Sequence, residues 1–184
     1  MHRSPVLPWL LGWSLGCAAP GPQPQSAAPA PVRPGIDVLL SDSMELVRGR
    51  RVGLVTHRAG VDSRGTSDVT RLRDAGIQVV ALFSPEHGFA GAADPGAAVA
   101  SSVDSATGLP IYSLYGRTSA PTDEMLEGID IMLVDLQDAG ARYYTYLFTT
   151  VEVVMKAAAR RNIMVVVLDR PNPIGGAVQG NVLD

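Results

Sequence analysis

The sequence predicts an α/β domain with a Rossmann-like open parallel sheet and helices on both faces, a three-layer αβα arrangement. Short apolar runs alternate with stretches of helical character over residues 35–184, the pattern of strands joined by crossover helices. The apolar runs are continuous and do not alternate with polar residues, as in parallel strands that are buried on both faces.

Composition limits the function classes that need to be considered. The chain has 184 residues, 46% of them hydrophobic, enough for one good core. Its formal net charge of −3 provides no basic stripe, so nucleic acid is not an expected partner. Neither G-x-G-x-x-G nor G-x-x-x-x-G-K-[ST] occurs, and we therefore expect no dinucleotide or nucleoside triphosphate cofactor. After the N-terminus, no apolar run is long enough to span a bilayer.

Residues 1–17 are interpreted as an export signal, with Arg3 followed by a mostly apolar stretch. Cys17 is the only cysteine and the candidate lipidation site of a lipoprotein-like signal, although Ser14 stands where leucine is usual. A plain secretory signal with an incidental Cys17 is the alternative. Residues 18–34 are rich in Pro and Ala and typical of a linker. We expect an exported protein, periplasmic or at the cell surface, whose one contact with the membrane is a lipid anchor at Cys17.

The predicted elements follow one another along the chain from about Gly35. Strands are expected at residues 51–56, 77–83, 109–114, 129–136 and 163–168. Thr66 is the predicted N-cap of a helix that stops at Gly76, and Thr122 the predicted cap of a shorter one. A longer helix is indicated by apolar residues at helical spacing, namely Leu147, Phe148, Val151, Val154, Met155 and Ala158. Residues 88–108 show no period and suggest a functional loop.

Four of the predicted strands lead directly into polar side chains. These are His57 with Arg58, Glu86 with His87, Gln137 with Asp138, and Asp169 with Arg170 and Asn172. In a doubly wound topology the carboxyl ends of neighbouring strands lie on one rim of the sheet, so these groups are expected to converge on one crevice. The alternative for each of them is a cap of a turn or a helix.

The adjacent pair Glu86 and His87 is the strongest candidate for chemistry. A glutamate works as general acid or base if burial raises its pKa toward neutrality, and Phe83 and Pro85 supply apolar neighbours. His87 could polarise a substrate, hold Glu86 or bond a backbone carbonyl. No metal site is assigned, because His57, His87, Asp138 and Asp169 lack a spaced signature such as H-E-x-x-H. A metal-dependent hydrolase stays the weaker alternative.

A run of aromatic residues follows the Asp138 loop. Arg142, Tyr143 and Tyr144 suit a sugar with an acidic substituent, because an aromatic ring packs on the apolar face of a sugar and Arg clamps a carboxylate. The alternative is that at least one tyrosine packs the helix start onto the sheet.

Four segments carry a resemblance to a known family, and they occur in the family's order. They are Ser84-Pro85-Glu86-His87-Gly88, Leu109-Pro110-Ile111-Tyr112-Ser113-Leu114-Tyr115-Gly116, Asp135-Leu136-Gln137-Asp138-Ala139-Gly140-Ala141-Arg142-Tyr143-Tyr144-Thr145-Tyr146 and Leu168-Asp169-Arg170-Pro171-Asn172-Pro173. From about Gly35 to its last residue, the chain resembles the exo-β-N-acetylmuramidases once catalogued as DUF1343, bacterial enzymes of cell-wall recycling.

The resemblance implies hydrolysis of β-1,4-linked N-acetylmuramic acid from the non-reducing end of peptidoglycan fragments. It also implies a Rossmann-like N-terminal domain, a second domain after it and an active site in the cleft between them. The family's proposed catalytic glutamate falls on Glu86, as proton donor. With it we assign His87 and Asp138 as candidate catalytic residues. The candidate substrate-binding residues are His57, Gln137, Arg142, Tyr143, Tyr144, Asp169, Arg170 and Asn172.

The chain departs from the family pattern at the expected cleft and in length. Thr56-His57-Arg58-Ala59-Gly60 stands where Thr-Asn-Gln-Thr-Gly is usual, and Ala90 where Arg is frequent. The sequence stops at Asp184, where the family's second domain would begin. The alternative to a catalytic domain is therefore a truncated, non-catalytic module that binds muramoyl sugars, or a remnant that needs a separate second domain. Asp138, Asp169 or the substrate's acetamido group could complement Glu86, so retention and inversion both stay open.

Overall fold

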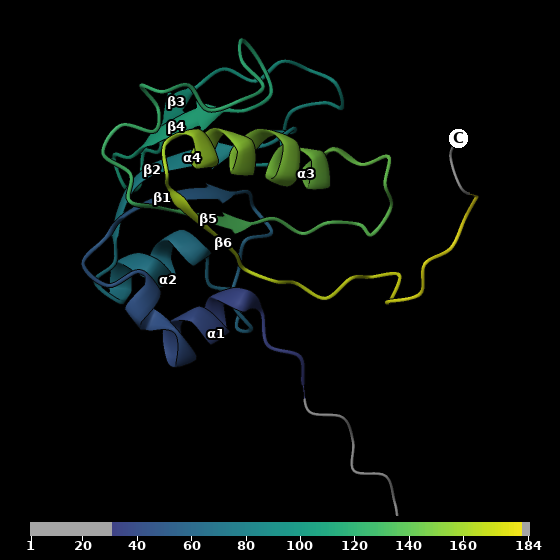
Figure 1. Ribbon diagram of the computed structural model, residues 1–184, viewed down its shortest axis with the longest axis horizontal. Coiled ribbons are helices and arrows are strands. Elements are labelled where there is room, and N and C mark those ends of the chain that lie inside the picture. The colour runs from purple at the N-terminus through teal and green to yellow at the C-terminus, as the bar shows by residue number, and fades with distance from the viewer. Residues whose placement is uncertain (1–30, 182–184) are drawn as a thin grey trace, which may run out of the picture. The chain divides into compact units, whose positions relative to one another are not determined.

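The computed structural model describes residues 31–181, and the described residues from Val32 onward belong to one compact unit. The predicted signal, Cys17 and most of the predicted linker lie outside the described residues. A six-stranded sheet with the strand order β3-β4-β2-β1-β5-β6 has helices on both faces (Figure 1). The predicted three-layer α/β fold is therefore confirmed.

The sheet is parallel except at one edge. Its strands are β1 (Arg51–Thr56), β2 (Gln78–Ser84), β3 (Ser102–Val103), β4 (Pro110–Ser113), β5 (Ile131–Asp135) and β6 (Met164–Val167). Every neighbouring pair is parallel apart from β3 and β4, which run antiparallel. The five predicted strands are thus found, each within a few residues of its expected bounds. The sixth, β3, is two residues long and lies in the loop without a period, where no alternation could reveal it.

The helices divide between the two faces of the sheet. They are α1 (Gly35–Asp42), the 3-10 turn η1 (Met44–Leu46), α2 (Asp68–Asp74), α3 (Thr145–Phe148), the π-helical segment η2 (Thr149–Met155) and α4 (Lys156–Arg160). In Figure 1, α1 and α2 cover one face, and the continuous helix formed by α3, η2 and α4 covers the other.

Two predicted helix starts need correction. The N-cap of α2 is Ser67 and not Thr66, because the Ser67 hydroxyl accepts a hydrogen bond from the Thr70 backbone N–H at 3.2 Å. No helix follows Thr122. Residues 123–128 form consecutive turns instead, with the Leu126 N–H donating to the Thr122 carbonyl at 3.2 Å.

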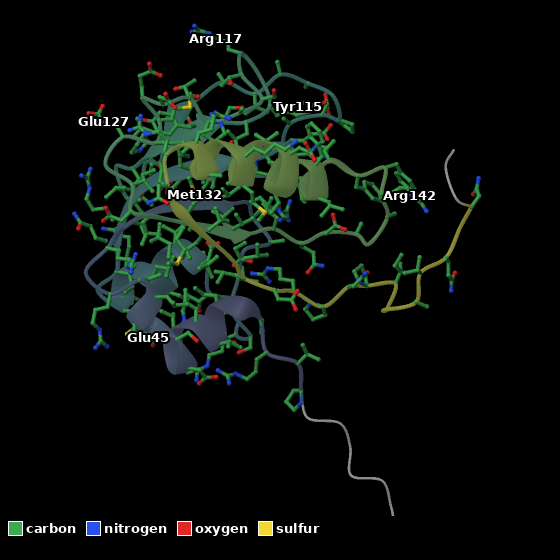
Figure 2. All side chains as sticks on the ribbon, viewed as in Figure 1. Glu45, Tyr115, Arg117, Glu127, Met132 and Arg142 are labelled. Carbon is green, nitrogen blue, oxygen red and sulfur yellow. The ribbon has the colours of Figure 1, made fainter. Side chains whose placement is uncertain are left out.

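Alternate residues of each central strand enter different cores. Leu54 and Leu133 belong to the core under α1 and α2, whereas Val55 and Met132 belong to the core under η2 and α4. Met132 lies in the interior in Figure 2, while Glu45 projects from the outside. Burial on both faces explains the continuous apolar runs in the sequence.

The apolar stripe predicted for the long helix is only partly buried. Val154 and Ala158 are fully buried, but Leu147 and Phe148 are 54% and 57% exposed, and Met155 is 40% exposed. The π-helical segment between them explains the difference, because its i→i+5 hydrogen bonds add a residue to each turn and rotate α3 out of phase with α4. A constant period of 3.6 residues was therefore the wrong assumption for this helix.

Strand β6 is the outermost strand on its side of the described sheet. Its end residues Met164 and Val167 are 43% and 54% exposed. Among residues 31–181, no helix combines the length and the apolar character needed to cross a membrane.

Truncation of a buried side chain in the central strand β5 should lower the stability of the domain. We expect Leu133→Ala to lower the free energy of unfolding by about 2–5 kcal/mol, because Leu133 is fully buried in β5 and its loss leaves a cavity. Leu147→Ala removes the same atoms from an exposed position and is the matched control. Urea unfolding followed by circular dichroism measures both, and equal losses in the two variants would contradict the packing described.

Candidate active site

The predicted polar residues lie at the carboxyl ends of the parallel strands. The chain runs outward from β1 through β2 to β4 and then returns to β5 on the other side of β1, so the sheet's switch point lies between β1 and β5. Ligands bind at this point in open α/β sheets. His57 leaves β1 and Gln137 follows β5 there, and the β1–β5 register ends with Thr56 opposite Asp135.

Glu86 is held by two segments that lie far from it in the sequence. Its Oε2 accepts a hydrogen bond from the Thr145 hydroxyl at 2.8 Å, at the start of α3. Its Oε1 accepts one from the Gly96 backbone N–H at 3.0 Å, in the loop after β2. The backbone carbonyl of Glu86 lies 3.4 Å from the Tyr146 hydroxyl. These contacts fix the carboxyl group between α3 and the long loop.

The same contacts set the charge of Glu86. The hydrogen bond from Thr145, followed by that from Gly96, holds the pKa of Glu86 below its ordinary value. These contacts do not produce the raised pKa that a proton donor needs at neutral pH, and the proton-donor role of Glu86 stays a prediction. Glu86 stands at the rim as a carboxylate, a form suited to a general base or a nucleophile.

The His87 side chain contacts the loop that follows it. Its Nδ1 lies 2.9 Å from the Ala93 carbonyl oxygen. Because that oxygen can only accept, Nδ1 carries the proton and Nε2 of the neutral ring is left as an acceptor. His87 also has a φ of 70°, in the left-handed region that few residues other than glycine adopt. Of the roles proposed from the sequence, a bond to a backbone carbonyl is the one found.

His57 is a buried residue that contacts the loop after β5 and the start of α3. Its ring is buried, its Nε2 accepts a hydrogen bond from the Gln137 backbone N–H at 3.3 Å, and it packs on Tyr146 at 5.0 Å between ring centroids. Burial, and then the nearby positive charge of Arg170, lowers the pKa of His57 to about 4. His57 is therefore a neutral group that ties β1 to the loop after β5. The sequence interpretation had placed it on the substrate.

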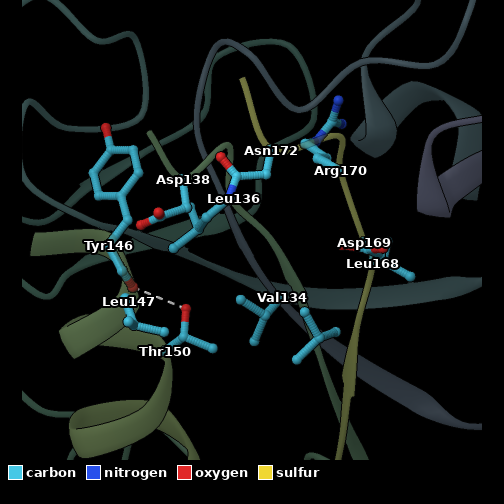
Figure 3. Close-up of a pocket in the computed structure, with 11 residues that line it drawn as sticks. Val134, Leu136, Asp138, Tyr146, Leu147, Thr150, Leu168, Asp169, Arg170 and Asn172 are labelled. Carbon is cyan, nitrogen blue, oxygen red and sulfur yellow. Dashed lines mark hydrogen bonds between the residues drawn. The ribbon is translucent and has the colours of Figure 1, made fainter. Parts of the chain in front are cut away.

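Asp138 lines a cavity of about 260 Å³ between α3 and the ends of β5 and β6 (Figure 3). Its Oδ1 accepts a hydrogen bond from the Gly140 N–H at 2.6 Å. Its Oδ2 is buried and has no hydrogen-bond partner among the described residues. Asp169, Arg170 and Asn172 line the same cavity, so four of the predicted site residues meet there, together with Tyr146.

Arg170 requires the clearest correction. Its guanidinium makes two hydrogen bonds to the Asp135 carboxylate, one of them 2.9 Å long from Nη2, and Nη2 also donates to the Val61 carbonyl at 2.9 Å. The two side chains are only 8% and 1% exposed. Arg170 was predicted to bind substrate; its Nε and Nη2 groups are instead engaged by Asp135 and Val61, although the residue also lines the cavity.

Gln137 and Asn172 connect the two loops on either side of the cavity. The Gln137 amide donates to the Asp138 and Pro171 carbonyls at 2.9 and 3.1 Å. The Asn172 Oδ1 accepts from the Ile174 N–H at 3.1 Å and fills the space beside Gly140, where a Cβ would come within 2.1 Å of it. Both predicted substrate ligands therefore shape the loops.

The aromatic run is exposed at the entrance to α3. Tyr143 is 78% and Tyr144 50% exposed, and their ring centroids lie 4.7 Å apart. Arg142 is exposed as well, and its Nη2 lies 3.4 Å from the Asn181 carbonyl oxygen. Figure 2 shows Arg142 beside the C-terminal segment. All three side chains are available to a ligand.

Sequence reasoning missed a buried acidic pair beneath the rim. Asp68 begins α2, accepts a hydrogen bond from the Thr56 hydroxyl and lies beside Asp135. Burial, with the neighbouring Asp135 charge, raises the pKa of Asp68 to about 7. The sequence showed only an acidic residue in a first helical turn, which is common at any helix start. Gly60 in the next loop is the one further signal, since a Cβ there would lie 2.5 Å from the Asp68 carboxylate.

In the part of the chain that the structure describes, no group of three or more His, Cys, Asp and Glu side chains is arranged to hold a metal ion. His57, His87, Asp138 and Asp169, considered together in the sequence, are not gathered into one.

Fold and site together define a Rossmann-like α/β domain whose functional groups stand at the carboxyl ends of parallel strands. Residues 52–184 match the family model described as "Exo-beta-N-acetylmuramidase NamZ, N-terminal". The chain belongs to this family.

Similar proteins agree with the match. The peptidoglycan β-N-acetylmuramidase NamZ of Bacillus subtilis (strain 168) is 45% identical over 169 residues, 91% of this chain and 41% of that protein. Two crystal structures of DUF1343 family proteins from Bacteroides fragilis NCTC 9343 share the fold. BF0371 has a TM-score of 0.74 at 45% identity over 83% of this chain, and BF0379 has 0.70 at 33% identity over 84%. The chain spans 38–41% of the length of these three proteins.

Removal of the Arg170 side chain should destabilise the domain strongly. We expect Arg170→Met to lower the free energy of unfolding by about 3–5 kcal/mol at pH 7, because Asp135 is left buried without its counter-ion. Arg161→Met is the control: its ion pair with Asp123 is exposed and 3.9 Å long, and such pairs contribute about 0–1 kcal/mol. Denaturant unfolding distinguishes the two, and a small loss for Arg170→Met would contradict a structural role.

Asp68 should make the stability of the domain depend on pH. Its pKa rises from 3.8 in the unfolded chain to about 7 on folding, so the native state retains a proton that the unfolded state releases between these values. The contribution of Asp68 to the free energy of unfolding therefore falls as the pH rises from about 4 to 7. The Asp68→Asn variant should not show this decrease.

Unfolding of the wild type and Asp68→Asn from pH 4.5 to 7 tests this directly. The slopes should differ by up to about 1.4 kcal/mol per pH unit, with the variant gaining stability relative to the wild type. His57 contributes in the opposite direction but equally in both proteins. Asp74→Asn, at the exposed end of the same helix, is the control, and its plot of stability against pH should run parallel to that of the wild type. A parallel plot for Asp68→Asn as well would contradict the raised pKa of Asp68.

Proposed function

We propose that this chain is the catalytic N-terminal domain of an exo-acting β-N-acetylmuramidase. It would hydrolyse β-1,4-linked N-acetylmuramic acid from the non-reducing end of peptidoglycan fragments. One observation carries the proposal: within this family of peptidoglycan hydrolases, Glu86 stands as a fixed carboxylate at a strand end, bonded by Thr145 and Gly96. His87 follows it and shapes the adjoining loop.

Glu86 is the proposed catalytic group and acts as general acid/base. It is ionised at the start of the reaction. As a carboxylate it accepts the proton of the water that attacks the anomeric carbon, or attacks that carbon itself; the bond from this carbon to the leaving oxygen breaks, and that oxygen takes up a proton from the second carboxyl group or from water. Asp138 is the proposed second carboxyl group. Its unpartnered Oδ2 beside the cavity supports this role, and Tyr146 spans the distance between the two, since it lines that cavity and its hydroxyl approaches the Glu86 carbonyl.

The exposed aromatic pair and Arg142 are the proposed sugar contacts. Tyr143 and Tyr144, whose ring planes are tilted by 41° to each other, offer exposed ring faces to the apolar side of a sugar. The Arg142 guanidinium suits the lactyl carboxylate of muramic acid, with which it can form a two-pronged hydrogen-bonded pair. Asp169 and Asn172, on the cavity wall, are the proposed polar contacts at the other side.

We further propose that the protein is exported, with residues 1–17 as a lipoprotein-like signal and Cys17 as the lipidated residue. This places the enzyme where peptidoglycan fragments arise. Detection of lipid on Cys17 in a membrane fraction tests it, and Cys17→Ala should release the protein into the soluble fraction.

A second candidate is a non-catalytic module that binds muramoyl sugars and needs a separate second domain. The apolar side chains of α3 favour it, because Leu147 and Phe148 are more than half exposed beside the site. In this case the described groups would hold the sugar, and the reaction would depend on a further polypeptide.

Hydrolysis of a chromogenic β-N-acetylmuramide distinguishes the two candidates. We expect Glu86→Gln to lower the rate by at least about 10²–10⁴-fold, because the variant can neither accept nor carry the proton. Glu127→Gln, which neutralises an exposed glutamate outside the site, should retain the full rate. A Glu86→Gln variant as active as the wild type would contradict the catalytic role, and a folded wild-type chain that binds the sugar without cleaving it would establish the binding module.

A further inference from the structure

A second cavity lies beneath the loop that follows β2 and is lined by His87, the residue after Glu86. It measures about 280 Å³ and is bounded by the end of β2, the middle of β4 and residues 88–102. Phe89, Val99 and Ile111 give it apolar walls. The cavity reaches the surface, because Ala92 and Ala100 line it and are exposed.

Ser84 supplies this cavity with an unused polar group. Ser84 is the last residue of β2, it lines the cavity, and its side chain is 1% exposed. Its hydroxyl has no hydrogen-bond partner among the described residues. An unpaired buried hydroxyl is costly, so a hydrogen-bonding group that enters the cavity would stabilise the Ser84 Oγ.

His87 supplies a second polar group of the opposite kind. It lines the same cavity, and its Nδ1–H donates to the Ala93 carbonyl, so Nε2 of the neutral ring accepts. The φ of 70° at His87 is one of two positive values among the described residues other than glycine. Such a backbone persists where the surroundings determine it, often at binding sites. The hydrogen bond to the Ala93 carbonyl holds the imidazole at the cavity.

The ligand chemistry follows from this set of groups. The cavity offers a hydroxyl that can donate, a ring nitrogen that accepts and apolar walls, and no Asp, Glu, Lys or Arg of the described residues lines it. A carboxylate would therefore find no counter-ion there. A secondary acetamide matches each group, with its C=O facing Ser84, its N–H facing His87 and its methyl group against Val99 and Ile111.

We propose that this cavity is the subsite for the 2-acetamido group of the sugar. The inference rests on the proposed function, in which Glu86 acts at the anomeric carbon. In a 2-acetamido sugar the acetamide is borne by the carbon next to the anomeric one, and the cavity is lined by His87, the residue that follows Glu86 in the chain. Ser84 and His87 are binding residues in this account.

Binding of two sugars that differ only in the group on carbon 2 tests the subsite without hydrolysis. Isothermal titration of the full chain with N-acetylmuramic acid and with 3-O-lactylglucose, which has a hydroxyl in place of the acetamide, should show at least about tenfold tighter binding of the first. Ser84→Ala should reduce this preference about tenfold. Ser113→Ala is the matched control, because Ser113 is the buried last residue of the neighbouring strand β4, does not line this cavity and already accepts a hydrogen bond from the Tyr115 N–H.

A second variant acts from the surface and leaves the core unchanged. Ala100→Leu adds an apolar side chain at the exposed edge of the cavity and should weaken N-acetylmuramic acid while sparing 3-O-lactylglucose. Equal affinity of the wild type for both sugars, or an unchanged preference in Ser84→Ala, would overturn the subsite and indicate a cavity that holds water only; the muramidase function would stand. Absence of binding to either sugar together with absence of hydrolysis would overturn the proposed function, and the subsite with it.

Discussion

The arrangement of the rim depends on one buried interaction, the ion pair between Arg170 and Asp135. Asp135 ends the central strand β5, and Arg170 lies just beyond the edge strand β6, so the pair fixes where the chain leaves both strands. The third donor contact, to the Val61 carbonyl, adds the loop after β1. Because Asp68 shares the same buried space, a proton rather than a second cation balances the remaining charge. Gln137 then connects the loops after β5 and β6, whose starting points are already in place.

Glu86 is positioned by a different principle. Its carboxyl group is partly accessible, and two hydrogen bonds from separate segments both orient it and keep it charged. Asp68 shows the opposite behaviour. Glu86 follows the carboxyl end of β2 and its pKa is lowered, whereas Asp68 stands at the amino end of the neighbouring α2 and its pKa is raised. Burial without enough donors retains a proton, whereas donors without burial remove it. The site therefore combines a charged carboxylate at the surface with a buried one that keeps its proton up to about pH 7.

The sequence predicted the fold well because β1, β2, β5 and β6 are continuous apolar runs, and such runs have few alternatives in a chain with helical segments between them. It predicted the location of the candidate site for the same reason, since a polar residue after a strand is visible in the sequence. The roles of the residues were harder. Thr145 is 59 residues from Glu86, and Asp135 was counted among the apolar residues of a strand, so neither contact has a local signature. The π-helical phase change also has none, because it arises from hydrogen bonding along the helix.

The exposed edge of the sheet has a consequence for handling the protein. β6 presents a row of backbone N–H and C=O groups on its outer side, where the described sheet ends, and it is composed of Met164-Val165-Val166-Val167. Neither proline nor a charged side chain interrupts this strand, although these are the usual protections of an edge. At high concentration two molecules can therefore extend their sheets across each other's β6. Solubility would then be governed by a four-residue backbone surface that takes no part in the chemistry.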